Sequence, residues 1–191
     1  MRRPIEATPS TANTTTRGAA TMANDKYEFT GETKVHLGVT LRQIRALRAF
    51  GLIAAGAIGG WIEKEGNLQV YGDARVYGNA QVYGAARVYG NARVYGDAQV
   101  SGNAQVYGNA WVYGDAWVSS PICAASRSDA YLFIITPDKD GVLRIIAGRR
   151  YFTIAEARAH WTATRGGTPL GDESLAIVDH LERMAAIRFA K

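Results

Sequence analysis

Between Val70 and Val118 a valine recurs at every sixth position without interruption. Most repeats are close to Val-Tyr-Gly-Asn-Ala-Gln or Val-Tyr-Gly-Asp-Ala-Arg, so an alanine stands two residues before each following valine. The segment Ala-x-Val-Tyr alternates small or apolar residues with polar or aromatic ones, which is the period-two pattern of a short strand with one buried face. The glycine and the Asn or Asp that follow tolerate the positive φ of a tight corner. Each repeat therefore predicts one strand and one corner, with valine and alanine inward.

A fixed period of six residues is typical of a solenoid built from strands, because helical solenoids repeat every roughly 33 to 47 residues. The repeats resemble the hexapeptide-repeat, left-handed β-helix family, which places an aliphatic residue at the first position and a small residue at the fifth. Valine and alanine stand at those two positions here. The resemblance implies triangular coils of three repeats each, so that equivalent residues three repeats apart lie one above the other. We therefore expect a mainly β fold, a single-chain left-handed parallel β-helix.

The register of the repeat extends beyond the valines in both directions. The apolar residues in register before the first valine are Leu52 and Ile58 at valine positions, and Ile62 and Leu68 at alanine positions. Lys64 is the one misfit, and Ile122 continues the pattern at an alanine position after the last valine. This extension predicts about four triangular coils of three repeats each, at 52–69, 70–87, 88–105 and 106–123.

Two segments of different character precede the predicted β-helix at 52–123. Residues 1–21 are rich in threonine, contain two prolines and show no periodicity, which predicts a disordered extension. Met22 offers a second translation start, so the sequence leaves open whether synthesis begins at Met1 or Met22.

Residues 26–51 predict a small N-terminal cap, because the end of a solenoid exposes unpaired backbone and apolar core that must be covered. Short strands are expected at 27–30 and 34–37. The spacing of apolar residues within 39–50 suits either a strand or a helix.

Residues 124–191 predict a C-terminal ββαα domain that caps the last coil. Two apolar segments flank the turn sequence Pro-Asp-Lys-Asp-Gly and predict a hairpin. Thr153 and Glu156 form the capping box of a first helix, and glycines and a proline separate it from the last one. The expected elements are strands at 131–136 and 142–147 and helices at 153–162 and 173–189.

Stacking one coil on the next places side chains of one kind in outward rows. One row sets Arg75 and Arg93 below Trp111, where a guanidinium can pack against an indole, and another holds Gln81, Gln99 and Trp117. Aromatic rows suit a binding surface, but they also stabilise neighbouring strands, and the sequence leaves both interpretations open. The candidate interaction surface comprises Tyr71, Tyr89 and Tyr107 in one row, Tyr77, Tyr95 and Tyr113 in a second, and Trp111, Trp117, Arg149 and Arg150.

Composition and charge narrow the class of partner. The chain is 47% hydrophobic and has a single cysteine, Cys123, so it can bury a core without disulfides and suits a reducing cytoplasm. The net charge of +5 lies in the segments that flank the repeat, and the lack of a basic stripe argues against nucleic acid. Arg149 and Arg150 are the local candidate for such contact, or else an ordinary hairpin end. The apolar run 50–62 contains four glycines and is too short to span a membrane.

The repeat itself offers little catalytic chemistry. Hexapeptide-repeat acyltransferases and carbonic anhydrases use histidines on the coils as a general base or as zinc ligands, so the resemblance makes the histidines informative. Here His36, His160 and His180 all lie outside the repeat. We therefore expect no catalytic residue, cofactor or metal, and a non-enzymatic scaffold that binds a protein partner or self-assembles as a dimer or trimer. The alternatives are a trimeric acyltransferase-like enzyme that uses His160 or His180, and a phage fibre component in which three chains wind together.

Residues 26–123 also resemble a family of uncharacterised bacterial and prophage-encoded β-helix proteins. The motifs that carry this resemblance are Thr-Leu-Arg-Gln-Ile-Arg-Ala-Leu-Arg at 40–48, Gly-Gly-Trp-Ile-Glu-Lys-Glu at 59–65 and the Gly-Asn-Ala repeats. The resemblance implies a bacterial or phage-encoded protein of the host cytoplasm, without a defined biochemical role.

Overall fold

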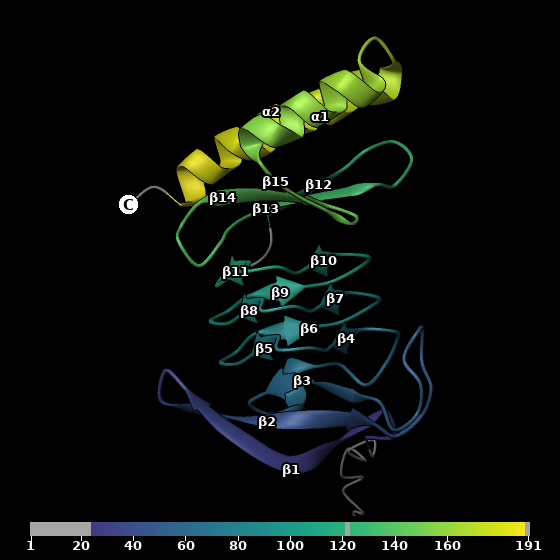
Figure 1. The fold of residues 1–191 in the computed structure, drawn as a ribbon, viewed down its shortest axis with the longest axis vertical. Coiled ribbons are helices and arrows are strands. Elements are labelled where there is room, and N and C mark those ends of the chain that lie inside the picture. The colour runs from purple at the N-terminus through teal and green to yellow at the C-terminus, as the bar shows by residue number, and fades with distance from the viewer. Residues whose placement is uncertain (1–23, 121–122, 190–191) are drawn as a thin grey trace, which may run out of the picture.

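The computed structural model describes residues 24–120 and 123–189. Its elements stack along one axis (Figure 1). A β-hairpin closes one end, the repeat forms the middle, and a sheet covered by two helices closes the other end. This arrangement leaves the sides of the stack, rather than its ends, as the outer surface of the repeat.

The repeat folds into eight two-residue strands that lie on three sides of a solenoid. The strands are β4 (Arg75–Val76), β5 (Gln81–Val82), β6 (Arg87–Val88), β7 (Arg93–Val94), β8 (Gln99–Val100), β9 (Gln105–Val106), β10 (Trp111–Val112) and β11 (Trp117–Val118). Parallel pairing orders them β4-β7-β10, β5-β8-β11 and β6-β9. Arg75 pairs with Arg93, which confirms the expected step of three repeats between neighbouring turns.

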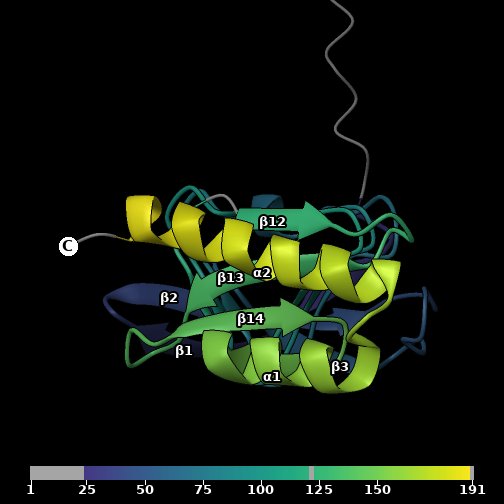
Figure 2. The same ribbon diagram turned by 90° about the horizontal axis from the view of Figure 1, so that it is seen from above.

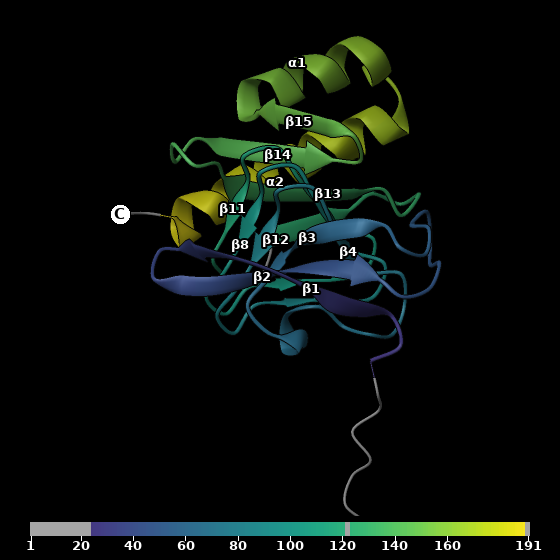
Figure 3. The ribbon, with the colours of Figure 1, turned by 60° about the horizontal axis from the view of Figure 1, so that its bottom comes forward.

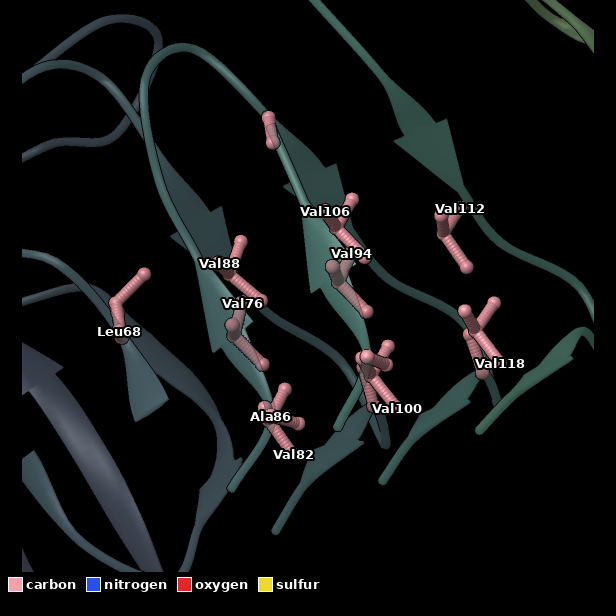
Figure 4. Packing of buried hydrophobic residues seen from close by; sticks show 14 of the residues in the cluster. Leu68, Val76, Val82, Ala86, Val88, Val94, Val100, Val106, Val112 and Val118 are labelled. Atoms are coloured by element: carbon pink, nitrogen blue, oxygen red, sulfur yellow. The ribbon is translucent and has the colours of Figure 1, made fainter. Parts of the chain in front are cut away.

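The valines and alanines of the repeat form the core of the solenoid. Every alanine and valine at the repeat positions from Ala74 to Val118 is at most 3% exposed, which confirms the inward assignment. Figure 4 shows the valines of successive turns packed against one another. The corner glycines hold the left-handed backbone that the pattern predicts; Gly72, for example, has a φ of 71°.

The solenoid has about three turns, and its start differs from the expected first coil at 52–69. Strand β3 (Ile58–Ile62) runs parallel to β5, but Ile62 pairs with Val82, two positions beyond the partner that a step of three repeats would give. Leu68 likewise bridges to Val88. Ile62 and Leu68 therefore occupy valine positions, not the alanine positions that we expected.

Two extra residues between Leu68 and Val76 cause this shift of register. The sequence alone does not locate this insertion, because it does not show which strands pair. Leu52 and Ile58 stand six residues apart in one register, and Ile62 and Leu68 stand six residues apart in the other. The expected inward positions of Leu52 and Ile58 are wrong, since these side chains are 83% and 55% exposed. Residues 50–57 instead form turns and one isolated bridge, between Phe50 and Ile53, that lie against the first turn.

The N-terminal cap is an antiparallel sheet of β1 (Tyr27–His36), β2 (Val39–Ala46) and β3. Figure 3 shows β1 and β2 crossing the bottom of the solenoid. The two short strands expected at 27–30 and 34–37 are one strand, which an irregularity around Gly31 (φ 96°) interrupts. The segment whose spacing suits a strand or a helix is a strand as far as Ala46.

The cap also supplies hydrogen-bond donors to the carbonyl groups at the start of the solenoid. In the interior, an alanine carbonyl accepts from the turn below, as when Arg75 N donates to Ala92 O at 2.9 Å. The first turn has no regular turn below it, so three different groups take over this role. Its carbonyls at Ala74, Ala80 and Ala86 accept from Lys26 Nζ (2.6 Å), Trp61 N (2.9 Å) and Asn67 Nδ2 (2.8 Å), and Asn67 belongs to the 3-10 helix η1 (Glu65–Asn67).

The C-terminal unit covers the last turn with a four-stranded antiparallel sheet and a helical pair. Its elements are β12 (Cys123–Ser126), β13 (Leu132–Pro137), β14 (Leu143–Ala147), β15 (Arg150–Thr153), α1 (Ile154–Arg165) and α2 (Pro169–Arg188). Ile134 and Ile146 join the solenoid core, whereas Phe133, Ile135 and Ile145 face the helices. Both helices lie on the sheet (Figure 2). The capping box at Thr153 is confirmed, and the sheet has two more strands than the pattern predicts.

Candidate functional site

A column of stacked tyrosines runs along one side of the solenoid. Tyr77 stacks on Tyr95 with ring centres 4.9 Å apart, and Tyr95 stacks on Tyr113 at 4.8 Å. Tyr151 of β15 continues the column at 5.6 Å from Tyr113. Burial raises the pKa of Tyr151 to about 12, and it raises the pKa of Tyr113 as well. Because each ring covers the face of the next, the column stabilises the stack and offers a partner mainly its edges.

The second expected row is only partly formed. Tyr89 stacks on Tyr107 at 5.4 Å, but Tyr71 has no stacked partner among the described residues. The register shift explains this. Leu68 bridges to Val88, so Gln69 rather than Tyr71 takes the position below Tyr89. Tyr71 and Tyr107 remain 58% and 46% exposed. A groove of about 680 Å³ on this side is lined by charged, polar and aromatic groups that include Lys64, Glu65, Arg87, Tyr71 and Tyr89.

The two mixed rows form as expected from the stacking step of three repeats. Arg75, Arg93 and Trp111 are in register, and the guanidinium of Arg93 lies 4.4 Å from the centre of the indole ring. Gln81, Gln99 and Trp117 are in register on the next side. Trp117 is 38% exposed, so it is one of the few large aromatic surfaces that the turns leave open.

A groove of about 800 Å³ contains Trp117 and spans all three parts of the molecule. We call it the lateral groove. The N-terminal hairpin contributes Leu37, the turns contribute Tyr83, Ser101, Trp117 and Ser119, and the C-terminal unit contributes residues 137–141, Leu143, Ala185, Ala186 and Phe189. The exposed side chains of Leu37 and Trp117 add apolar surface to this groove.

His36 holds the N-terminal wall of the lateral groove against the solenoid. Its Nε2 lies 3.0 Å from Gln99 Oε1, and the hydroxyl of Tyr83 donates to the same oxygen at 3.3 Å. The imidazole also meets the Tyr83 ring edge-on at 5.7 Å. The fold therefore places a histidine on the side of the solenoid, although none belongs to the repeat. The alternation Lys34-Val35-His36-Leu37 was the one sequence signal for it, since it puts Lys34 and His36 on the same face of a strand.

The opposite wall is fixed by Asp138 in the hairpin between β13 and β14. Asp138 Oδ2 accepts from Arg144 Nε at 2.8 Å, and Oδ1 accepts from the backbone of Asp140 and Val142. Burial alone would raise the pKa of Asp138, but these hydrogen bonds hold it below its usual value. Ala116 bridges to Asp138, so the wall is attached directly to the last turn.

The arginine pair and the remaining histidines lie away from the lateral groove, on the C-terminal unit. Arg149 and Arg150 are exposed at the turn between β14 and β15. Arg150 Nε donates to His160 Nε2 at 2.8 Å, and burial followed by this guanidinium lowers the pKa of His160. His180 is exposed on α2. The structure does not bring either helical histidine to the tyrosine rows.

In residues 24–120 and 123–189, no three His, Cys, Asp or Glu side chains lie close enough to share a metal ion. No helix in that part of the chain is long and apolar enough to cross a bilayer.

Comparison with known proteins identifies the repeats but not an individual relative. The family model described as YdcK β-solenoid repeat matches residues 68–84, 86–102, 98–114 and 104–120. No curated protein matches the chain. These matches fall on the stacked turns, where β4 to β11 repeat every six residues. The repeat matches and the stacked turns together support a place for this chain among β-solenoid repeat proteins.

Proposed function

We propose that this protein is a non-enzymatic scaffold that binds a protein partner in the lateral groove. The observation that carries the proposal is the composition of that groove, which combines the N-terminal hairpin, the solenoid and the C-terminal unit around exposed Trp117. The stacked turns hold the two walls at a set separation, because each turn is hydrogen-bonded to the next. A rigid spacer with a preformed groove is what such an arrangement provides.

The chemistry of the lateral groove suits a protein surface. Interfaces concentrate aromatic and apolar anchors at their centre and place charges at the rim. Trp117, Leu143 and Phe189 supply apolar contacts here, while Lys139 and Asp140 lie exposed beside them. The stacked tyrosine column is a weaker candidate, since its ring faces are already in contact with one another.

The experiment is to measure binding with one anchor removed. The full chain with an affinity tag should retain a partner from a bacterial lysate, identified by mass spectrometry, and the purified partner should then be titrated against variants. We expect W117A to weaken binding at least tenfold, which corresponds to about 1.4 kcal/mol. Y71A is the matched control, because Tyr71 is an exposed aromatic residue on another side of the solenoid. Equal affinities of both variants and the unchanged chain would refute binding in the lateral groove.

Self-association through the same groove is tested by light scattering coupled to size-exclusion chromatography. A dimer or trimer that W117A dissociates would make a second copy the partner. The alternative of an acyltransferase-like enzyme requires acyl-CoA turnover that substitution of His160 and His180 abolishes. We expect no such turnover, because His160 Nε2 already accepts a hydrogen bond from Arg150.

The setting of this function is also a proposal. A phage-encoded or prophage-encoded protein of the bacterial cytoplasm, with left-handed winding of the turns, is supported by the resemblance of residues 26–123 to such proteins. The phage origin is tested by identifying the partner from lysates of phage-infected and uninfected cells. A phage protein should have its partner enriched in one of the two lysates, whereas equal recovery from both would count against a phage origin.

A further inference from the structure

Arg75 is a buried cation that no described acidic side chain contacts in an ion pair. It stands at an outward position of the repeat, yet it is only 4% exposed, because residues 50–53 of the N-terminal cap lie over it. Among the described residues it forms no ion pair, and its Nη1 has no hydrogen-bond partner. A buried guanidinium without partners is costly, because its lost hydration is not replaced. The site is therefore incomplete as far as protein groups alone are concerned.

Other cations gather around Arg75, so the excess is local rather than confined to one side chain. Arg93 lies beside it on the next turn, also without an ion pair among the described residues, and its Nε is unpartnered. Lys26 is fully buried nearby, with its ammonium 4.6 Å from the centre of the Phe50 ring. Burial and the neighbouring guanidinium of Arg93 lower the pKa of Arg75. Asp73 is exposed and forms no ion pair with these groups, although its charge favours the protonated form of both Arg75 and Lys26.

A small cavity adjoins this charge. It has a volume of about 20 Å³ and lies between the N-terminal cap and the first turn. A cavity needs roughly 10 to 15 Å³ to admit one water-sized particle, so this one has room for a single small occupant. Arg75 is the one charged residue in its described lining, and apolar side chains such as Ile44, Ile53 and Leu68 form most of the rest. Such a lining provides few of the hydrogen-bond acceptors that a water molecule would need.

We infer that this cavity binds a single small inorganic anion of the size of chloride, held by the guanidinium of Arg75. One negative charge there satisfies the unpartnered Nη1 and offsets the repulsion among Arg75, Arg93 and Lys26. The anion lies between residues 50–53 and the first turn, so it fastens the N-terminal cap to the solenoid. This site is independent of the lateral groove, which lies on another side of the stack.

The test is the dependence of thermal unfolding on the anion at fixed ionic strength. Sodium chloride is exchanged stepwise for sodium gluconate, whose anion is too large for the cavity. We expect the melting temperature of the full chain to rise by about 3 °C or more for each tenfold increase in chloride above the dissociation constant. Bromide should act like chloride, and crystals soaked in sodium bromide should show an anomalous peak beside Arg75.

R87L is the matched control for R75L. Arg87 occupies the same repeat position on another side of the solenoid but is exposed, so R87L should keep the chloride dependence that R75L loses. If R75L does not fold, the bromide peak in the unchanged protein decides the matter. Equal melting temperatures in chloride and gluconate, or a water molecule in the cavity in place of bromide, would overturn the inference.

Discussion

Replacing Ala92 with leucine tests the packing of the solenoid most directly. Ala92 is completely buried in the middle of the stack, and the alanines one turn below and one turn above, Ala74 and Ala110, are completely buried too. Overfilling a packed core typically costs about 1 to 3 kcal/mol. Relaxation here would also disturb the hydrogen bonds from Arg75 N to Ala92 O (2.9 Å) and from Arg93 N to Ala110 O (2.8 Å), each worth about 1 kcal/mol net. We therefore expect A92L to lower the free energy of unfolding by about 3 kcal/mol.

The assay is urea denaturation followed by circular dichroism and tryptophan fluorescence. N103A serves as the control, because Asn103 is an exposed corner residue and the chain already has alanine at the equivalent corner one turn below, Ala85. N103A should stay within about 0.5 kcal/mol of the unchanged protein. If the free energy of unfolding of A92L also stays within that margin, and its slope against urea concentration is unaltered, the tightly packed alanine row is refuted.

Three further predictions concern the cap, the corners and the lateral groove. Burial lowers the pKa of Lys26 to about 8, so above that pH the unfolded chain binds more protons than the folded chain. The free energy of unfolding, measured by urea titration, should therefore rise by about 2 kcal/mol from pH 7.5 to 9.5. K26M should show no such rise. G72A should destabilise the protein by more than about 2 kcal/mol, because a Cβ at Gly72 would lie 2.5 Å from a carbonyl oxygen of the next turn. A Cβ at Gly108 would meet no atom within 4 Å, so G108A should lose only about 1 kcal/mol for the positive φ of this residue. Equal losses of stability in thermal unfolding would contradict the close stacking of corners. Q99A should cost about 1 kcal/mol by urea denaturation, and H36A should add little to it, since both remove the same hydrogen bond; additive losses would show that the bond is not formed.

The expectation that Gln99 is a simple outward residue shows where the sequence pattern stops being informative. Period-two alternation correctly places its side chain outside the solenoid core. It carries no information about His36, which is 63 residues away in sequence and reaches Gln99 through the curvature of the N-terminal hairpin. Lys26 illustrates the same point, because its bond to Ala74 O links residues 48 apart that share no pattern.

The sequence by itself determined the repeating part of this protein. A six-residue period with inward valine and alanine specifies the strand and the corner, because each turn contacts only its neighbours and local pattern is enough. The stacking step of three repeats was implied by the resemblance to hexapeptide-repeat proteins, and the strand pairing confirms it. Only the tertiary structure decided the register of Ile62 and Leu68, the capping of the first turn and the lateral groove. These depend on contacts between segments distant in sequence, where the two extra residues before Val76 and the path of the hairpin set which side chains meet.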